Sequence, residues 1–184
     1  MKTSRMLAMA IASLAAASAV HAQWYVGGAL GHSEFNDGNG TLQAGAGSDQ
    51  SDTGYKLYGG YTLNRNMAVE AGYVQHGKFT LTNAGTPFGI KSHGWFIDGV
   101  GLMPLNNAWT LRGKVGLIHG RSKTFGLPPN NYSDSGNDWR FGAGVAYALN
   151  PKMQVVAEWE RSRYRAWNDK ASVDLLSIGM TYGF

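Results

Sequence analysis

The feature that most constrains this chain is an alternation of apolar residues with small or polar residues, repeated in short segments after Ala22. It is clearest near the C-terminus, where Leu176 and Ile178 alternate with Ser177 and Gly179. Successive side chains of a β-strand point to opposite faces, so this pattern predicts strands with one apolar face. No run after Ala22 is long and apolar enough for a membrane-spanning helix.

The pattern predicts eight strands, joined by connections of two kinds. The strands are expected at 24–35, 52–63, 67–79, 90–103, 108–123, 138–149, 153–165 and 173–184. Short Asn-containing turns are expected at 63–66, 105–107 and 149–152, and longer polar loops at 36–51, 80–89, 124–137 and 166–172. Short turns at one end and long loops at the other are typical of outer-membrane barrels. We therefore predict an all-β fold, an eight-stranded antiparallel up-and-down transmembrane β-barrel.

The N-terminal residues predict export. Lys2 and Arg5 precede an apolar, Ala-rich stretch at 6–17, and small residues surround Ala22. This is the arrangement of a cleaved signal peptide. The alternative, a transmembrane anchor, needs about 20 apolar residues, and the stretch is shorter. We predict a signal peptide at 1–22 and one barrel domain at 23–184.

The composition fits an exported barrel. The chain has no cysteine, 26 glycines, and 6 Trp with 9 Tyr. An exported domain without disulfides needs another source of stability, and a closed ladder of strands in a membrane supplies one. Removing Lys2 and Arg5 from the formal charge of +4 leaves +2 (4 − 2 = 2), which does not indicate nucleic-acid binding.

Aromatic residues cluster near the predicted strand ends. Those towards the short turns are Trp24, Tyr61, Trp109, Tyr147, Tyr182 and Phe184, and those further along the strands are Tyr73, Trp95, Trp139 and Tyr164. Two aromatic girdles are expected in a membrane barrel, whereas a soluble β-sandwich, the alternative, has no reason to form them. The final alternating residues, Ile178, Met180, Tyr182 and Phe184, are expected to be the signal that the barrel-assembly machinery reads.

Strand parity predicts a charged interior. The residues expected to face inward are Lys56, Glu70, Asp98, Arg112, Lys114, Arg140, Glu158 and Glu160, four basic and four acidic. Small and ionic side chains are thus expected to fill the tube. Unpaired buried charges cost several kcal/mol each, so these charges should pair. The favoured interpretation is a rigid polar core, and the alternative is a salt-bridge gate that passes small ions.

Three segments resemble the OmpA-like transmembrane domain. They are 24–31 (WYVGGALG), the hairpin from 59–61 (GGY) to 69–73 (VEAGY), and 176–182 (LSIGMTY). The family's gate has a Glu and an Arg, which alignment places at Ala146 and Val156, so the gate does not carry over as a unit; Glu70 matches the family's third-strand Glu. The resemblance implies a Gram-negative, porin-like outer-membrane protein. The family's periplasmic peptidoglycan-binding domain is not expected in this chain.

We predict no catalytic residues, metal site or cofactor. The mature chain has four histidines, His32, His76, His93 and His119, and none has a metal-ligand spacing. Some small barrels modify lipid A with a His–Ser pair, but here Ser92 merely precedes His93 at a strand end.

Arg161, Arg163 and Arg165 share one face of the seventh predicted strand near the loop end. They could bind lipopolysaccharide phosphates in the anionic outer leaflet, or they could be a solvated stripe.

The expected partners are outer-membrane lipid and lipopolysaccharide, and the barrel-assembly machinery and periplasmic chaperones during biogenesis. We expect a monomer.

Three functional hypotheses follow from the sequence. The leading one is a structural outer-membrane barrel that supports envelope integrity and presents loops for surface interaction. The alternatives are a low-conductance ion pore and, with less support, a lipid A-modifying enzyme.

Overall fold

The computed structural model describes the strands and short turns of the chain. The described residues are 23–37, 48–49, 51–83, 86–125, 133–166 and 169–184, with side chains described at 23–34, 52–77, 91–122, 135–163 and 172–184. The predicted signal peptide at 1–22 lies outside them. Within these ranges no helix is long and apolar enough to cross a membrane.

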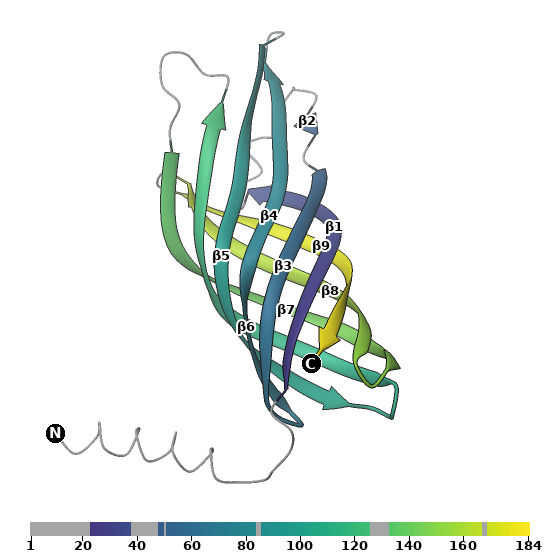
Figure 1. Cartoon of the computed structure of the whole chain (residues 1–184). Helices are drawn as coiled ribbons and strands as arrows, with labels where there is room; N and C mark the ends of the chain where they lie inside the picture. The colour runs from purple at the N-terminus through teal and green to yellow at the C-terminus, as the bar shows by residue number, and fades with distance from the viewer. Residues whose placement is uncertain (1–22, 38–47, 50, 84–85, 126–132, 167–168) are drawn as a thin grey trace, which may run out of the picture.

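All described elements are strands. They are β1 (Trp24–Asp37), β2 (Ser48–Asp49), β3 (Ser51–Asn64), β4 (Met67–Asn83), β5 (Thr86–Pro104), β6 (Trp109–Phe125), β7 (Ser133–Asn150), β8 (Met153–Ala166) and β9 (Asp169–Gly183). The eight long strands each pair antiparallel with their neighbours in the chain, and β1 pairs with β9 to close the sheet (Figure 1). Among the described residues, the two-residue β2 pairs with β4 alone.

Closure removes the free edges of the sheet. Both sides of every long strand have a partner strand, so the backbone groups that face lipid are paired within the sheet. The predicted fold class, an eight-stranded antiparallel transmembrane barrel, is confirmed.

An Asn side chain caps each of the three short turns. Asn64 Oδ1 accepts a hydrogen bond from the backbone N–H of Asn66 at 2.8 Å. Asn106 Oδ1 accepts two such bonds, at 2.9 and 2.8 Å, and Asn150 Oδ1 accepts two at 2.9 Å. These local bonds replace the ladder bonds that end where the chain reverses. The turns lie together at what we call the turn end of the barrel, and the opposite end is the loop end (Figure 1).

The strands extend further towards the loop end than the sequence predicted. Much of the predicted loops at 80–89, 124–137 and 166–172 is strand, and β2 lies within the predicted loop at 36–51. For example, the register of β4 with β5 continues through Thr82 and Pro87. Polar composition indicated loops there, but the backbone ladder continues across polar residues because its hydrogen bonds do not depend on the side chains.

The outer face is apolar and exposed to the surroundings of the barrel. Leu30 and Ile178 are 64% and 62% exposed, and similar residues lie on every long strand. Exposed apolar surface of this extent marks a lipid-facing protein.

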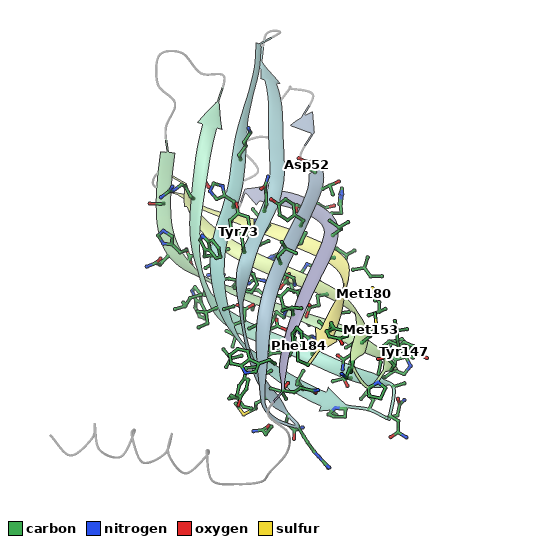
Figure 2. The ribbon with its side chains drawn as sticks, in the orientation of Figure 1. Asp52, Tyr73, Tyr147, Met153, Met180 and Phe184 are labelled. Atoms are coloured by element: carbon green, nitrogen blue, oxygen red, sulfur yellow. The ribbon has the colours of Figure 1, made fainter. Side chains whose placement is uncertain are left out.

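Aromatic side chains border this apolar band at both ends. At the turn end, Trp109 lies 4.9 Å from Tyr147 between ring centroids. Nearer the loop end, Tyr73 lies 5.2 Å from Trp95. Figure 2 shows Tyr147 and Phe184 towards the turn end and Tyr73 closer to the loop end. Rings at these two heights suit the two interfaces of a membrane. The side chain of Tyr164 lies outside the described set.

Candidate functional site: the barrel interior

The structure places all eight predicted inward charges inside the barrel, each at most 6% exposed. We call this set the ionic layer. Its members are Lys56 on β3, Glu70 on β4, Asp98 on β5, Arg112 and Lys114 on β6, Arg140 on β7, and Glu158 and Glu160 on β8. Six strands therefore contribute to one cluster whose formal charges cancel.

Glu158 lies at the centre of the ionic layer. Lys56 Nζ donates to its Oε2 at 2.7 Å and Lys114 Nζ donates to the same oxygen at 3.0 Å. Arg112 Nε donates to its Oε1 at 3.0 Å. One carboxylate thus joins three cations from two other strands. Such charge-assisted bonds compensate for the loss of water around each group.

Glu70 is held by two cations and a tyrosine. Arg112 Nη2 donates to its Oε1 at 2.5 Å, and Lys114 Nζ donates to its Oε2 at 2.9 Å. The Tyr25 hydroxyl donates to Oε1 at 2.9 Å. A Cβ at Gly60 would overlap the Tyr25 ring, so the glycine makes room for it. Sequence analysis missed Tyr25, although its inward parity was a usable signal.

Arg140 connects Glu160 and Asp98 within the ionic layer. Its Nη2 donates to Glu160, whose Oε2 also accepts from Lys56 Nζ at 2.8 Å. Its Nε lies 3.4 Å from Asp98, and its guanidinium carbon lies 4.0 Å from the Phe96 ring centre. Neither carboxylate oxygen of Asp98 has a hydrogen-bond partner. Asp98 is therefore the most weakly held acid of the layer.

An apolar layer fills the barrel on the loop side of most of these charges. Its members are Tyr58, Val74, Phe96, Ile118, Val173 and Leu175. Val74 lies four residues beyond Glu70 along β4, and Ile118 lies four beyond Lys114 along β6, both towards the loop end. The prediction that only small and ionic side chains fill the tube is wrong at this height. An interior of this width has to be filled by side chains, and apolar ones fill it here without needing partners.

A polar cavity lies on the other side of the ionic layer, at the turn end. Its volume is about 260 Å³, and its lining includes Thr62, Arg65, Gln154 and the ionic-layer residue Arg112. Solvent-sized space therefore reaches the charges from the turn end, while the apolar layer lies beyond them.

The two positions aligned with the family gate carry no charge. Ala146 and Val156 are register partners, both inward and 2% exposed. Glu70, the third-strand match, bonds instead to Arg112 and Lys114. The charges of this barrel thus form a different set of pairs from the family's gate.

The arginines predicted to contact lipopolysaccharide differ in their surroundings. Arg161 donates from Nε and Nη2 to the two oxygens of Asp174, at 2.6 and 2.5 Å. Arg163 is exposed, and its register partner is Ser172. Arg165 pairs with Lys170 in the ladder, but its side chain lies outside the described set. Asp174, which sequence analysis missed, therefore compensates one of the three charges.

Ser92 and His93 do not form a His–Ser pair. Ser92 is buried whereas the neighbouring His93 faces outward, so adjacent strand positions separate them. No group of His, Cys, Asp and Glu among the described residues could hold a metal ion. The proposed assembly residues Ile178, Met180, Tyr182 and Phe184 are all exposed on the outer face.

Comparison with known proteins agrees with this architecture. Residues 5–184 match the family described as "Outer membrane protein beta-barrel domain". Outer membrane protein A of Salmonella typhi is 24% identical over 194 residues, with 100% of this chain and 55% of the relative covered. The chain thus spans about half the length of the curated relatives it matches.

Two solved structures share the fold. Ail of Yersinia pestis, solved with a heparin analogue, is 20% identical with a TM-score of 0.62, covering 89% of this chain and 99% of Ail. Neisserial surface protein A is 17% identical with a TM-score of 0.64, covering 88% of this chain and 97% of that structure. The family match over almost the whole chain shows that this protein belongs to the outer-membrane β-barrel family and is located in the cell outer membrane.

Proposed function

We propose that the protein is a closed structural barrel that supports the integrity of the outer membrane and presents its loop end for surface interaction. The observation that carries this proposal is the filled interior. The ionic layer is internally paired, and the apolar layer lies on the loop side of most of its charges. The side chains of the apolar layer offer a crossing ion nothing in place of its hydration shell, which is how hydrophobic constrictions oppose ion passage.

A low-conductance pore is the second candidate, and the cavity at the turn end favours it. That cavity reaches Arg112. Among the described residues, the paired charges, the apolar layer and buried polar side chains such as His76 and Ser162 separate it from the loop side. Rearrangement of the ion pairs alone would not open a path, because Ile118 and Leu175 do not take part in them.

Planar-bilayer recording on the refolded protein tests closure. We expect no discrete openings from the wild type. The double variant Ile118→Ser/Leu175→Ser should conduct, because hydroxyls would hydrate the apolar layer. Val115→Ser, on the outer face of β6, is the matched control and should stay closed. Openings by the wild type, at a level unchanged in the double variant, would contradict closure and favour the pore.

An envelope role is tested in cells. A strain without the protein should become more sensitive to detergent and large antibiotics, and expression of the wild type should restore resistance. Unchanged sensitivity would contradict the role in integrity.

The proposal includes partners but no catalysis. The barrel works as a monomer within outer-membrane lipid and lipopolysaccharide, without nucleic acid, cofactor or enzymatic chemistry. The barrel-assembly machinery and periplasmic chaperones act during its biogenesis, and deletion of the exposed Phe184 should lower the amount inserted. The Ail structure in complex with a heparin analogue supports an anionic partner for a barrel of this fold. Mass spectrometry of lipid A with and without the protein tests for an enzyme.

A further inference from the structure

We propose that the polar cavity at the turn end of the barrel, which we call the mouth cavity, binds a phosphate group that reaches it from the periplasm. The ligand is inorganic phosphate or the phosphate monoester of a small organic molecule. The proposed envelope role does not use this cavity, so the site would be a second property of the barrel.

Cationic side chains line the mouth cavity. Arg65 lies in the turn between β3 and β4, Lys152 in the turn between β7 and β8, and Arg112 on β6. Its described lining includes no acidic residue. Among the described residues, neither Arg65 nor Lys152 has an ion-pair partner. The lining is therefore positively charged, whereas the formal charges of the ionic layer cancel.

The acidic residues of the chain lie away from the turn end. There are 12 of them, and four belong to the ionic layer. The other eight (12 − 4 = 8) lie in the loop-end parts of β1, β2, β3, β7 and β9. No acid is left for the part of the chain between the ionic layer and the turns. An anion from outside the chain is therefore what would compensate the cations of the mouth cavity.

The cations of the mouth cavity come from different walls of the barrel. Four strands separate the turns of Arg65 and Lys152 whichever way round the barrel is followed, so the two residues reach the cavity from opposite sides. Arg112 belongs to the ionic layer and lines the deep end. Its bonds to Glu158 and Glu70 use Nε and Nη2, and Nη1 takes part in neither bond. Positive charge thus surrounds one space from three directions.

Phosphate suits this arrangement better than a carboxylate does. A phosphate monoester carries nearly two negative charges at neutral pH and presents three acceptor oxygens in different directions. A carboxylate has one charge and two oxygens in one plane. Thr62, Thr110 and Gln154 also line the cavity, and their hydroxyl and amide groups can donate to the same oxygens.

The size and position of the mouth cavity define the ligand further. Its volume of about 260 Å³ equals that of about nine waters at about 30 Å³ each, which admits a phosphate group with a small substituent but no large ligand. Short turns of outer-membrane barrels face the periplasm. The ionic layer lies at the inner end of the cavity, so the ligand would enter and leave on the periplasmic side.

Isothermal titration calorimetry on the full refolded barrel, in an uncharged detergent at low salt, tests the site. Inorganic phosphate and glycerol phosphate are the probes for free phosphate and for a monoester, and acetate is the probe for a carboxylate. The test variants are Arg65→Gln and Lys152→Gln, alone and together. Arg121→Gln is the matched control, because Arg121 is an exposed cation on the outer face of β6 towards the loop end. Arg112 stays unchanged because it also holds Glu70 and Glu158.

We expect both phosphates to bind the wild type, and each single variant to bind them about tenfold more weakly, as for the loss of one charge-assisted hydrogen bond. The double variant should lose about a hundredfold, because the two residues reach the ligand from separate walls. Arg121→Gln should bind as the wild type does, and heat-modifiable gel migration should show that every variant forms the closed barrel.

Three results would overturn the phosphate site. They are no phosphate binding by the wild type, acetate binding as tight as phosphate binding, and a loss in Arg121→Gln equal to that in the test variants. Binding of glycerol phosphate without binding of inorganic phosphate would support the site and assign it to an organic monoester.

Discussion

The ionic layer and the apolar layer fill adjacent levels of the same tube in opposite ways. Glu158 bonds to three cations from β3 and β6, so each member depends on the others. Ile118 and Leu175 fill space without directional partners. The comparison teaches that strand pairing alone does not determine an eight-stranded interior. Charges impose a specific set of contacts, whereas the apolar residues fill the space beside them without directional partners.

The largest expected effect is in the ionic layer. Glu158→Gln removes the central charge and leaves Lys56, Arg112 and Lys114 undercompensated, which should lower the free energy of unfolding by about 3–5 kcal/mol. Urea unfolding of the protein refolded into vesicles, followed by Trp fluorescence, measures it. Glu34→Gln, on the exposed outer face, is the control. If Glu158→Gln lowered the free energy of unfolding no more than Glu34→Gln does, the ionic layer would tolerate the loss of a charge as well as the exposed outer face does.

A substitution in the apolar layer should destabilise the barrel through loss of packing. Ile118→Ala opens a cavity with no broken bond, at a cost of about 2–5 kcal/mol in the same unfolding experiment. Adding 1 M salt should leave this loss unchanged, since no ion pair is involved. A salt-dependent loss would show that the two layers are coupled rather than distinct.

Asp98→Asn tests whether a weakly held charge of the ionic layer contributes less to stability than Glu158 does. Asp98 has one ion pair, at 3.4 Å, and no hydrogen bond, and Arg140 keeps Glu160. We expect the free energy of unfolding to fall by only about 1 kcal/mol, because this is the usual net contribution of one polar contact. A loss as large as that of Glu158→Gln would show that the layer acts as a single unit.

The smallest effect is expected outside the tube. Arg161→Ala breaks the pair with Asp174, which is partly exposed on the outer face, so the loss should be about 0–1 kcal/mol. Urea unfolding of this variant measures the loss in the free energy of unfolding. The Arg161–Asp174 pair is the exposed counterpart of the buried ion pairs. A loss above 2 kcal/mol would contradict the distinction between buried and exposed pairs.

The sequence by itself determined the strand pattern, the Asn-capped turns, the closed barrel and the inward parity of all eight charges. Each of these follows from local rules, because strand parity repeats every two residues and turn residues act through their own backbone. The loop-end boundaries were predicted too short, since local composition does not show how far a ladder continues.

Only the tertiary structure decided which charges meet and what else fills the tube. Lys56 and Glu158 are 102 residues apart in the chain and bond at 2.7 Å because the register of eight strands brings them to one height. The same register assembles the apolar layer and the Tyr25–Glu70 bond. These contacts depend on the cumulative stagger of the strands around a closed barrel. The sequence of a single segment does not determine that stagger.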